Sequence, residues 1–89
     1  METYKAKNDI SWKLLKDSVV VVNTTTGVYY TLNPTASVIW QNLIESGSTS
    51  GIADKMCEIF DNIDKDTIQN DIDECVTFWK AEEIIEPNV

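Results

Sequence analysis

The sequence predicts an α+β fold in which a three-stranded antiparallel sheet precedes three helices, a small winged helix-turn-helix-like domain. Residues 10–32 carry strand features, namely alternating apolar and polar side chains and a run of four valines. From residue 33 onward, apolar residues recur at the three- and four-residue spacing of amphipathic helices. A chain of 89 residues is long enough for one modest core and one domain.

Three strands are expected first. Ile10–Leu15 alternates as a half-buried strand does, and after a turn at 16–18 the β-branched run Val19–Val22 disfavours a helix. The loop NTTTG supplies Gly27 for a positive φ and leads into a third strand, Val28–Leu32. Joined by such short connections, the three strands predict an antiparallel meander.

Two helices are expected next. The pair Asn33-Pro34 suits an N-cap followed by the first helical residue, and Gly47 suits the end of that helix. A second helix is expected to open at Thr49 or Ser50, although Gly51 weakens its first turn.

A third helix is expected after a connector at 61–64. Asp64 or Asp66 suits its N-cap, its apolar stripe faces a core, and it is expected to run to about Glu83, with residues 84–87 as a tail. Residues 1–9 are polar and are expected to be flexible, so the domain is expected to span 10–86, with 87–89 trailing. The sequence shows neither an apolar run that could cross a bilayer nor a signal-like N-terminus, which predicts a cytoplasmic protein.

The charge is concentrated in the second half of the chain. The formal net charge is −8, and residues 51–89 hold eleven acids and three lysines. Such a surface repels phosphates and anionic lipid heads, so nucleic acid and membranes are disfavoured as partners. A basic or apolar segment is the better candidate partner.

No residue pattern predicts catalysis. The chain has no histidine, no glycine-rich phosphate loop and no calcium-loop register, so no metal and no cofactor is predicted. Cys57 and Cys75 are far apart and fall at apolar helical positions, which indicates buried thiols rather than a disulfide or a metal pair. The acids Asp71, Asp73 and Glu74 are interpreted as the solvated side of the third helix.

The strand Val28–Leu32 is expected at an edge of the sheet. It contains neither proline nor lysine, the usual blockers of edge pairing, so an extended peptide can add to it through backbone hydrogen bonds. Alternatively, Tyr29 or Tyr30 packs in the core and the third helix covers the edge. A function from another class, an acidic winged-helix domain that regulates through protein contacts without binding DNA directly, also remains open.

Three segments resemble the PqqD-like family. They are TGVYYTLNPTASVIWQNLIESG, TSGIADKMCEIFDNIDKDTIQND and DIDECVTFWKAEEII, and together the resemblance covers about residues 11–86. The resemblance implies a non-enzymatic domain that binds the leader of a ribosomally made precursor peptide by strand addition to the third strand. It also implies delivery to a maturation enzyme, such as a radical-SAM protein or a leader protease, in a pyrroloquinoline quinone, lasso-peptide or thioether-peptide pathway.

The resemblance also places a site between the third strand and the third helix. The residues carried over to the leader-binding cleft are Val28, Tyr29, Tyr30, Thr31, Leu32, Asp71, Cys75 and Phe78. Asp71 matches a position where an acid can meet a basic leader residue, and Phe78 either faces the cleft or packs against Ile85. The chain departs from the family pattern at Trp79, where leucine is usual, at Glu83, where glycine is common, and at Ser50-Gly51, where better helix formers stand.

Overall fold

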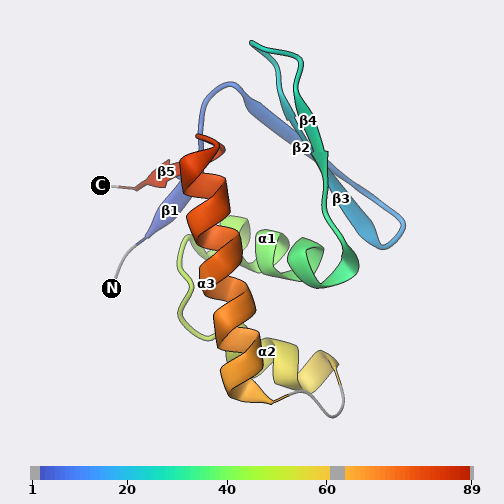
Figure 1. The fold of residues 1–89 in the computed structure, drawn as a ribbon, viewed down its shortest axis with the longest axis vertical. Coiled ribbons are helices and arrows are strands. Elements are labelled where there is room, and N and C mark those ends of the chain that lie inside the picture. The colour runs from blue at the N-terminus through green and yellow to red at the C-terminus, as the bar shows by residue number, and fades with distance from the viewer. Residues whose placement is uncertain (1–2, 61–63, 89) are drawn as a thin grey trace.

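The computed structural model describes residues 3–60 and 64–88 (Figure 1). Its elements in chain order are β1 (Tyr4–Ala6), β2 (Ile10–Leu15), β3 (Ser18–Asn23), β4 (Tyr29–Thr31), α1 (Pro34–Ser46), α2 (Ile52–Ile59), α3 (Lys65–Ala81) and β5 (Ile85–Pro87). The described helices include none that is long and apolar enough to cross a membrane. The predicted order of a three-stranded sheet and then three helices is confirmed, and two further short strands frame it.

The sheet β2-β3-β4 is the antiparallel meander that the sequence predicts. Val19 and Val21 of the central strand are fully buried and face α1, because alternate residues of a strand point to the same side. Val21 pairs with Tyr30 of β4, so the side chain of Tyr30 shares this inner face. Tyr29 pairs with Val22 on the outer face, where its side chain is exposed.

The first helix begins and ends as predicted. The side chain of Asn33 accepts a hydrogen bond from the backbone N–H of Ala36 at 2.8 Å, and Pro34 is the first helical residue. Gly47 ends the helix with φ of 77°, a left-handed conformation that glycine adopts without a Cβ penalty. Ser37, on the first turns, is buried and accepts from the Val19 N–H at 2.8 Å, which fixes α1 against the sheet.

The second and third helices differ from expectation at their ends. Helix α2 begins at Ile52 with Gly51 as its cap, so the predicted opening at Thr49 or Ser50 is wrong; Gly51 has φ of 82°, which stops the helix from starting earlier. Asp64, one of the two predicted N-cap residues, is the N-cap position of α3, although its side chain makes no capping hydrogen bond; the helix ends at Ala81, two residues before the predicted end near Glu83. The connector predicted at 61–64 lies, for residues 61–63, outside the described residues.

Glu83 has φ of 59°, the left-handed region in which side chains are disfavoured. That position is where the resemblance expects glycine. The backbone after α3 therefore adopts a conformation that glycine accommodates easily, although glutamate occupies this position.

The two ends of the described chain pair with each other. Strand β1 pairs antiparallel with β5, Tyr4 is 5% exposed, and its N–H donates to the Gly47 carbonyl at 2.6 Å. The expectation of a flexible stretch over residues 1–9 is therefore wrong for Tyr4–Ala6. Residues 84–87 are not a free tail, because Ile84 and Ile85 are buried and Ile85–Pro87 form the strand β5. Neither three-residue strand shows a sequence pattern by itself, because each is too short for a periodicity and is stabilised by segments far away in the chain.

Three tryptophans pack the sheet, α1 and α3 against one another. Trp40 of α1 is fully buried and meets Trp79 of α3 edge to face, with ring centroids 5.2 Å apart. On its other side it meets Trp12 of β2 at 6.2 Å, also edge to face. Such pairs are stabilised beyond the area they bury. Trp79, which stands where the family usually has leucine, therefore fills the core between α1 and α3.

Candidate functional site

The outer edge of β4 is free of any strand within the described residues. The two residues that flank β4 are hydrogen-bonded to β3: the Val28 carbonyl accepts from the Asn23 N–H, and the Leu32 N–H donates to the Val19 carbonyl, each at 2.8 Å. Because the backbone groups of alternate residues in an antiparallel ladder point to the same neighbour, the N–H and C=O groups of Tyr29 and Thr31 point away from β3. They face the free edge, as an added strand requires.

A cavity of about 270 Å³ lies on the inner side of this edge, between the end of β4 and α3. Its lining residues are Thr31, Leu32, Asn33, Ala36, Glu74, Cys75, Phe78 and Trp79. The α3 residues among them follow helical spacing, which brings them to one face. Trp79 is 2% exposed, so its ring belongs to the packed core beneath the cavity.

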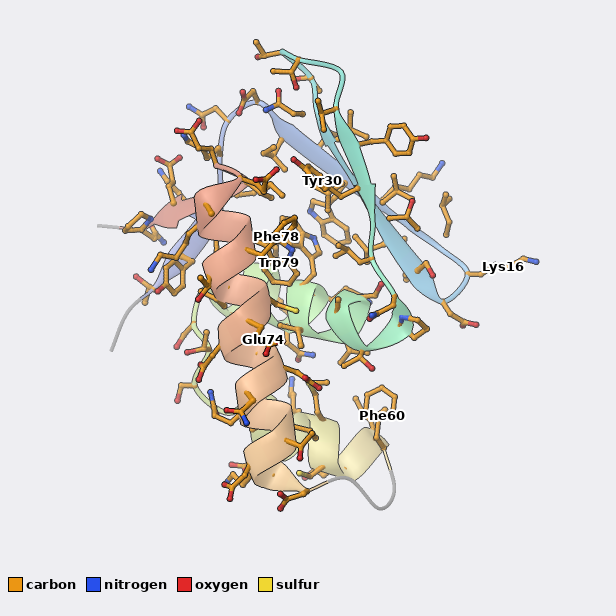
Figure 2. All side chains as sticks on the ribbon, viewed as in Figure 1. Lys16, Tyr30, Phe60, Glu74, Phe78 and Trp79 are labelled. Carbon is orange, nitrogen blue, oxygen red and sulfur yellow. The ribbon has the colours of Figure 1, made fainter. Side chains whose placement is uncertain are left out.

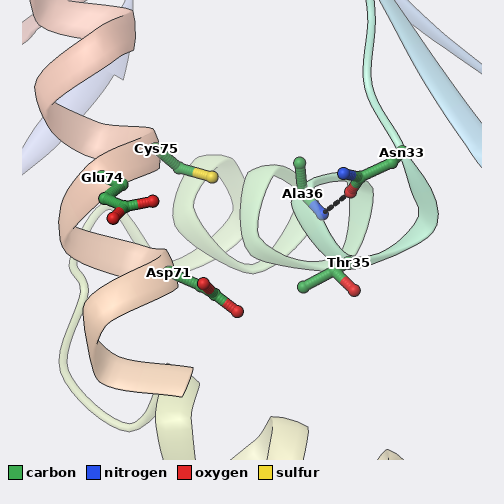
Figure 3. A pocket seen from close by; sticks show the side chains of 6 residues that line it. All are labelled: Asn33, Thr35, Ala36, Asp71, Glu74 and Cys75. Carbon is green, nitrogen blue, oxygen red and sulfur yellow. Dashed lines mark hydrogen bonds between the residues drawn. The ribbon is translucent and has the colours of Figure 1, made fainter. Parts of the chain in front are cut away.

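A second cavity of about 240 Å³ continues the first toward the start of α1 (Figure 3). It is lined by Asn33, Thr35, Ala36, Asp71, Glu74 and Cys75. Asp71 and Cys75 project from α3 toward α1, and Glu74 lies beside them on α3 (Figure 3). We call the two adjoining cavities the groove; they share Asn33, Ala36, Glu74 and Cys75.

The groove is acidic at one end. The ion pairs among the described residues join Lys7 to Glu83 and Lys65 to Asp54, so Asp71 and Glu74 are unpaired. Burial raises the pKa of the Cys75 thiol to about 11, and the nearby charges of Asp71 and Glu74 add to the shift. The thiol is therefore protonated at neutral pH and serves as a small, weakly polar part of the wall.

The other end of the groove carries aromatic rings (Figure 2). Phe78 of α3 is 49% exposed and meets the ring of Tyr30 edge to face, with centroids 6.0 Å apart. The Tyr30 hydroxyl donates to the Glu82 carboxylate at 2.7 Å, and this bond, with a smaller effect of burial, raises the pKa of Tyr30. The sequence left open whether Phe78 faces the cleft or packs against Ile85. In the structure it lies beside Tyr30 and lines the cavity.

The structure brings together most of the residues that the resemblance assigns to the cleft. Thr31, Leu32, Asp71, Cys75 and Phe78 line the groove, and Tyr30 contacts Phe78. Val28 and Tyr29 are not among the lining residues, although the backbone of Tyr29 lies at the free edge. Both cysteines are only partly buried, so the expectation of two buried thiols is wrong in degree.

Five groove residues were not among the predicted site residues: Asn33, Thr35, Ala36, Glu74 and Trp79. Glu74 was interpreted as solvated, yet it lies three residues after Asp71 and four before Phe78, a helical spacing that signals the same face. Ala36 falls on the apolar spacing of the first helix, which by itself indicates a core position and not a groove. No sequence signal marks Glu82, because its partner Tyr30 is 52 residues away.

Two solved structures are similar over nearly the whole chain. TbiB1 in complex with the TbiA(beta) leader peptide shares 25% identity over 96% of this chain and 98% of that chain, with a TM-score of 0.84. A lasso peptide synthetase B1 complexed with the leader peptide shares 24% identity over 96% of this chain and 99% of that chain, with a TM-score of 0.83. No match is found among curated proteins.

Residues 18–85 match the family described as Coenzyme PQQ synthesis protein D (PqqD). The matched range runs from β3 to the start of β5 and includes β4, α3 and the whole groove. The resemblance noted from the sequence is thereby confirmed, and the chain belongs to the PqqD family.

Proposed function

We propose that this protein is a non-catalytic module that captures the leader of a ribosomally made precursor peptide. The leader adds as a strand to the free edge of β4 and places alternate side chains into the groove. The observation that carries the proposal is the free edge itself, with the outward backbone groups of Tyr29 and Thr31 beside the groove.

The family and the similar structures support the same proposal. Both similar structures are described as complexes with a leader peptide. The bound leader would then meet a maturation enzyme, a radical-SAM protein or a leader protease, in a pyrroloquinoline quinone, lasso-peptide or thioether-peptide pathway. Because ribosomal precursors are made in the cytoplasm, the encounter is placed there.

Side-chain roles within the site follow from their positions. The backbone of residues 28–32 pairs with the leader, while Leu32, Cys75 and Phe78 form the apolar part of the groove wall. Asp71 lies at the acidic end, where a basic leader residue gains from a carboxylate without a competing lysine.

An amide-shift NMR titration tests the proposal. The ligand is the synthetic leader of the precursor peptide encoded beside this gene, and a scrambled peptide of the same composition is the control. Saturable shifts confined to residues 28–36 and 71–82 are expected. Shifts centred on β2 or α2, or equal shifts with the scrambled peptide, would show that the edge of β4 is not the site.

A further inference from the structure

One side chain bridges the two walls of the groove. Helix α3 packs against α1, α2 and β5. Tyr30 reaches from β4 to α3, where its hydroxyl donates to Glu82 at 2.7 Å and its ring contacts Phe78 (Figure 2). Glu82 is the C-cap residue of α3, so the bridge joins the strand to the very end of the helix.

The bridge leaves the strand edge free. The side chain of Tyr30 is on the inner face of the sheet, because Tyr30 pairs with the buried Val21. The backbone groups that an added strand needs belong to Tyr29 and Thr31 and lie in the plane of the sheet. A bound peptide and the bridge can therefore be present together.

We propose that Tyr30 and Glu82 form a strut that sets the width of the groove, and that affinity for the leader depends on it. The proposal rests on the proposed function and names Glu82 as a positioning residue that acts through Tyr30. A hydrogen bond to a carboxylate is shorter and stronger than one between neutral groups, which suits a strut.

Affinity depends on the width of the groove because the peptide must contact β4 and α3 at the same time. Its backbone binds the edge of β4 while its inward side chains contact α3, so the separation of strand and helix has to match the peptide. A wall that is already held in place loses less conformational freedom when the peptide binds. The strut also holds the Phe78 ring, which lines the cavity.

Calorimetric titration of the same synthetic leader into a set of variants tests the strut. Tyr30→Phe removes the hydroxyl and keeps the ring, whereas Glu82→Ala removes the acceptor. Each is expected to weaken leader binding on the order of five- to ten-fold, the effect of losing preorganisation rather than a direct contact. The double variant is expected to bind no more weakly than either single one, because both changes break one bond.

Two further variants separate the hydrogen bond between Glu82 and Tyr30 from the effect of removing a negative charge. Glu82→Gln keeps an oxygen that can accept from Tyr30 and is expected to restore most of the affinity. Glu58→Ala removes an exposed acid of α2, away from the groove, and is expected to bind as the unaltered protein does. Rescue by glutamine would not follow if only the charge at Glu82 mattered.

The outcomes separate the two proposals. Binding of the leader by the unaltered protein together with unchanged or tighter binding by Tyr30→Phe would overturn the strut and leave the proposed function standing. Additive losses in the double variant would also overturn it, since they would mean two independent contacts. Absence of leader binding by the unaltered protein would overturn the proposed function and the strut with it.

Discussion

Replacement of Thr31 by proline removes one backbone donor at the free edge of β4. The Thr31 N–H points away from β3, so the sheet loses no hydrogen bond when it is deleted. Proline is tolerated on an edge strand when the missing N–H faces outward, and the residue before it, Tyr30, is already extended. The domain is therefore expected to fold, while a leader strand loses the partner of one of its carbonyl groups.

The expected loss of leader affinity follows from the loss of the single hydrogen bond that the Thr31 N–H donates to the leader. Deleting one partner of a hydrogen bond while the other partner stays buried costs about 1–3 kcal/mol. That range corresponds to an increase in Kd of about 5- to 150-fold. Thr31→Val keeps the N–H and the branched side chain, so the difference between the two variants isolates the donor.

Calorimetric or fluorescence titration of the leader measures this difference, after an amide NMR spectrum has shown that both variants are folded. The reasoning is refuted if folded Thr31→Pro binds the leader as tightly as Thr31→Val. In that case the leader would not pair with β4 at Thr31, and strand addition at this register would have to be abandoned.

Three other measurements address the acidic end of the groove and the paired chain ends. Asp71→Lys should weaken leader binding and flatten its dependence on salt, and an unchanged salt slope would remove Asp71 from the site. Because the Cys75 pKa is raised from 9.0 to about 11, its thiolate fraction at pH 8 should be lower by about a hundred-fold than in an unfolded chain, and iodoacetamide labelling followed by mass spectrometry should be correspondingly slow. Asp71→Asn removes one negative charge near the thiol, so it should lower that pKa and speed labelling; no change would mean that the charge of Asp71 does not contribute to the shift. Tyr4→Ala should lower the free energy of unfolding in urea by about 3–5 kcal/mol, whereas a loss below 1 kcal/mol would contradict the burial of β1.

Local signals predicted the elements that carry their own pattern. The alternation of β2, the valines of β3 and the cap pair Asn33-Pro34 each favour one conformation over a few residues, and the structure has each of these elements. The half-burial predicted for Ile10–Leu15 is wrong, because all residues of β2 after Ile10 are exposed. The edge position of β4 also followed from the sequence, because a meander leaves its first and last strands at the edges.

The features that the sequence did not predict depend on contacts between residues that are far apart in the chain. Strands β1 and β5 are three residues each and lie about eighty residues apart in the chain, so neither has a periodicity to detect. Glu82 meets Tyr30 only after the core has placed α3 beside the sheet.

By itself, the sequence determined the fold class, the order of the three meander strands and the three helices, the acidic second half and the presence of an unblocked strand. These properties depend on periodicity, capping and composition, which are local. Only the tertiary structure decided which backbone groups face the free edge, that the face of α3 with Asp71, Glu74 and Cys75 lies against the start of α1, and that Tyr30 links β4 to the end of α3. The physical reason is that such contacts arise from the packing of distant segments around Trp40 and Trp79, which no short stretch of sequence encodes.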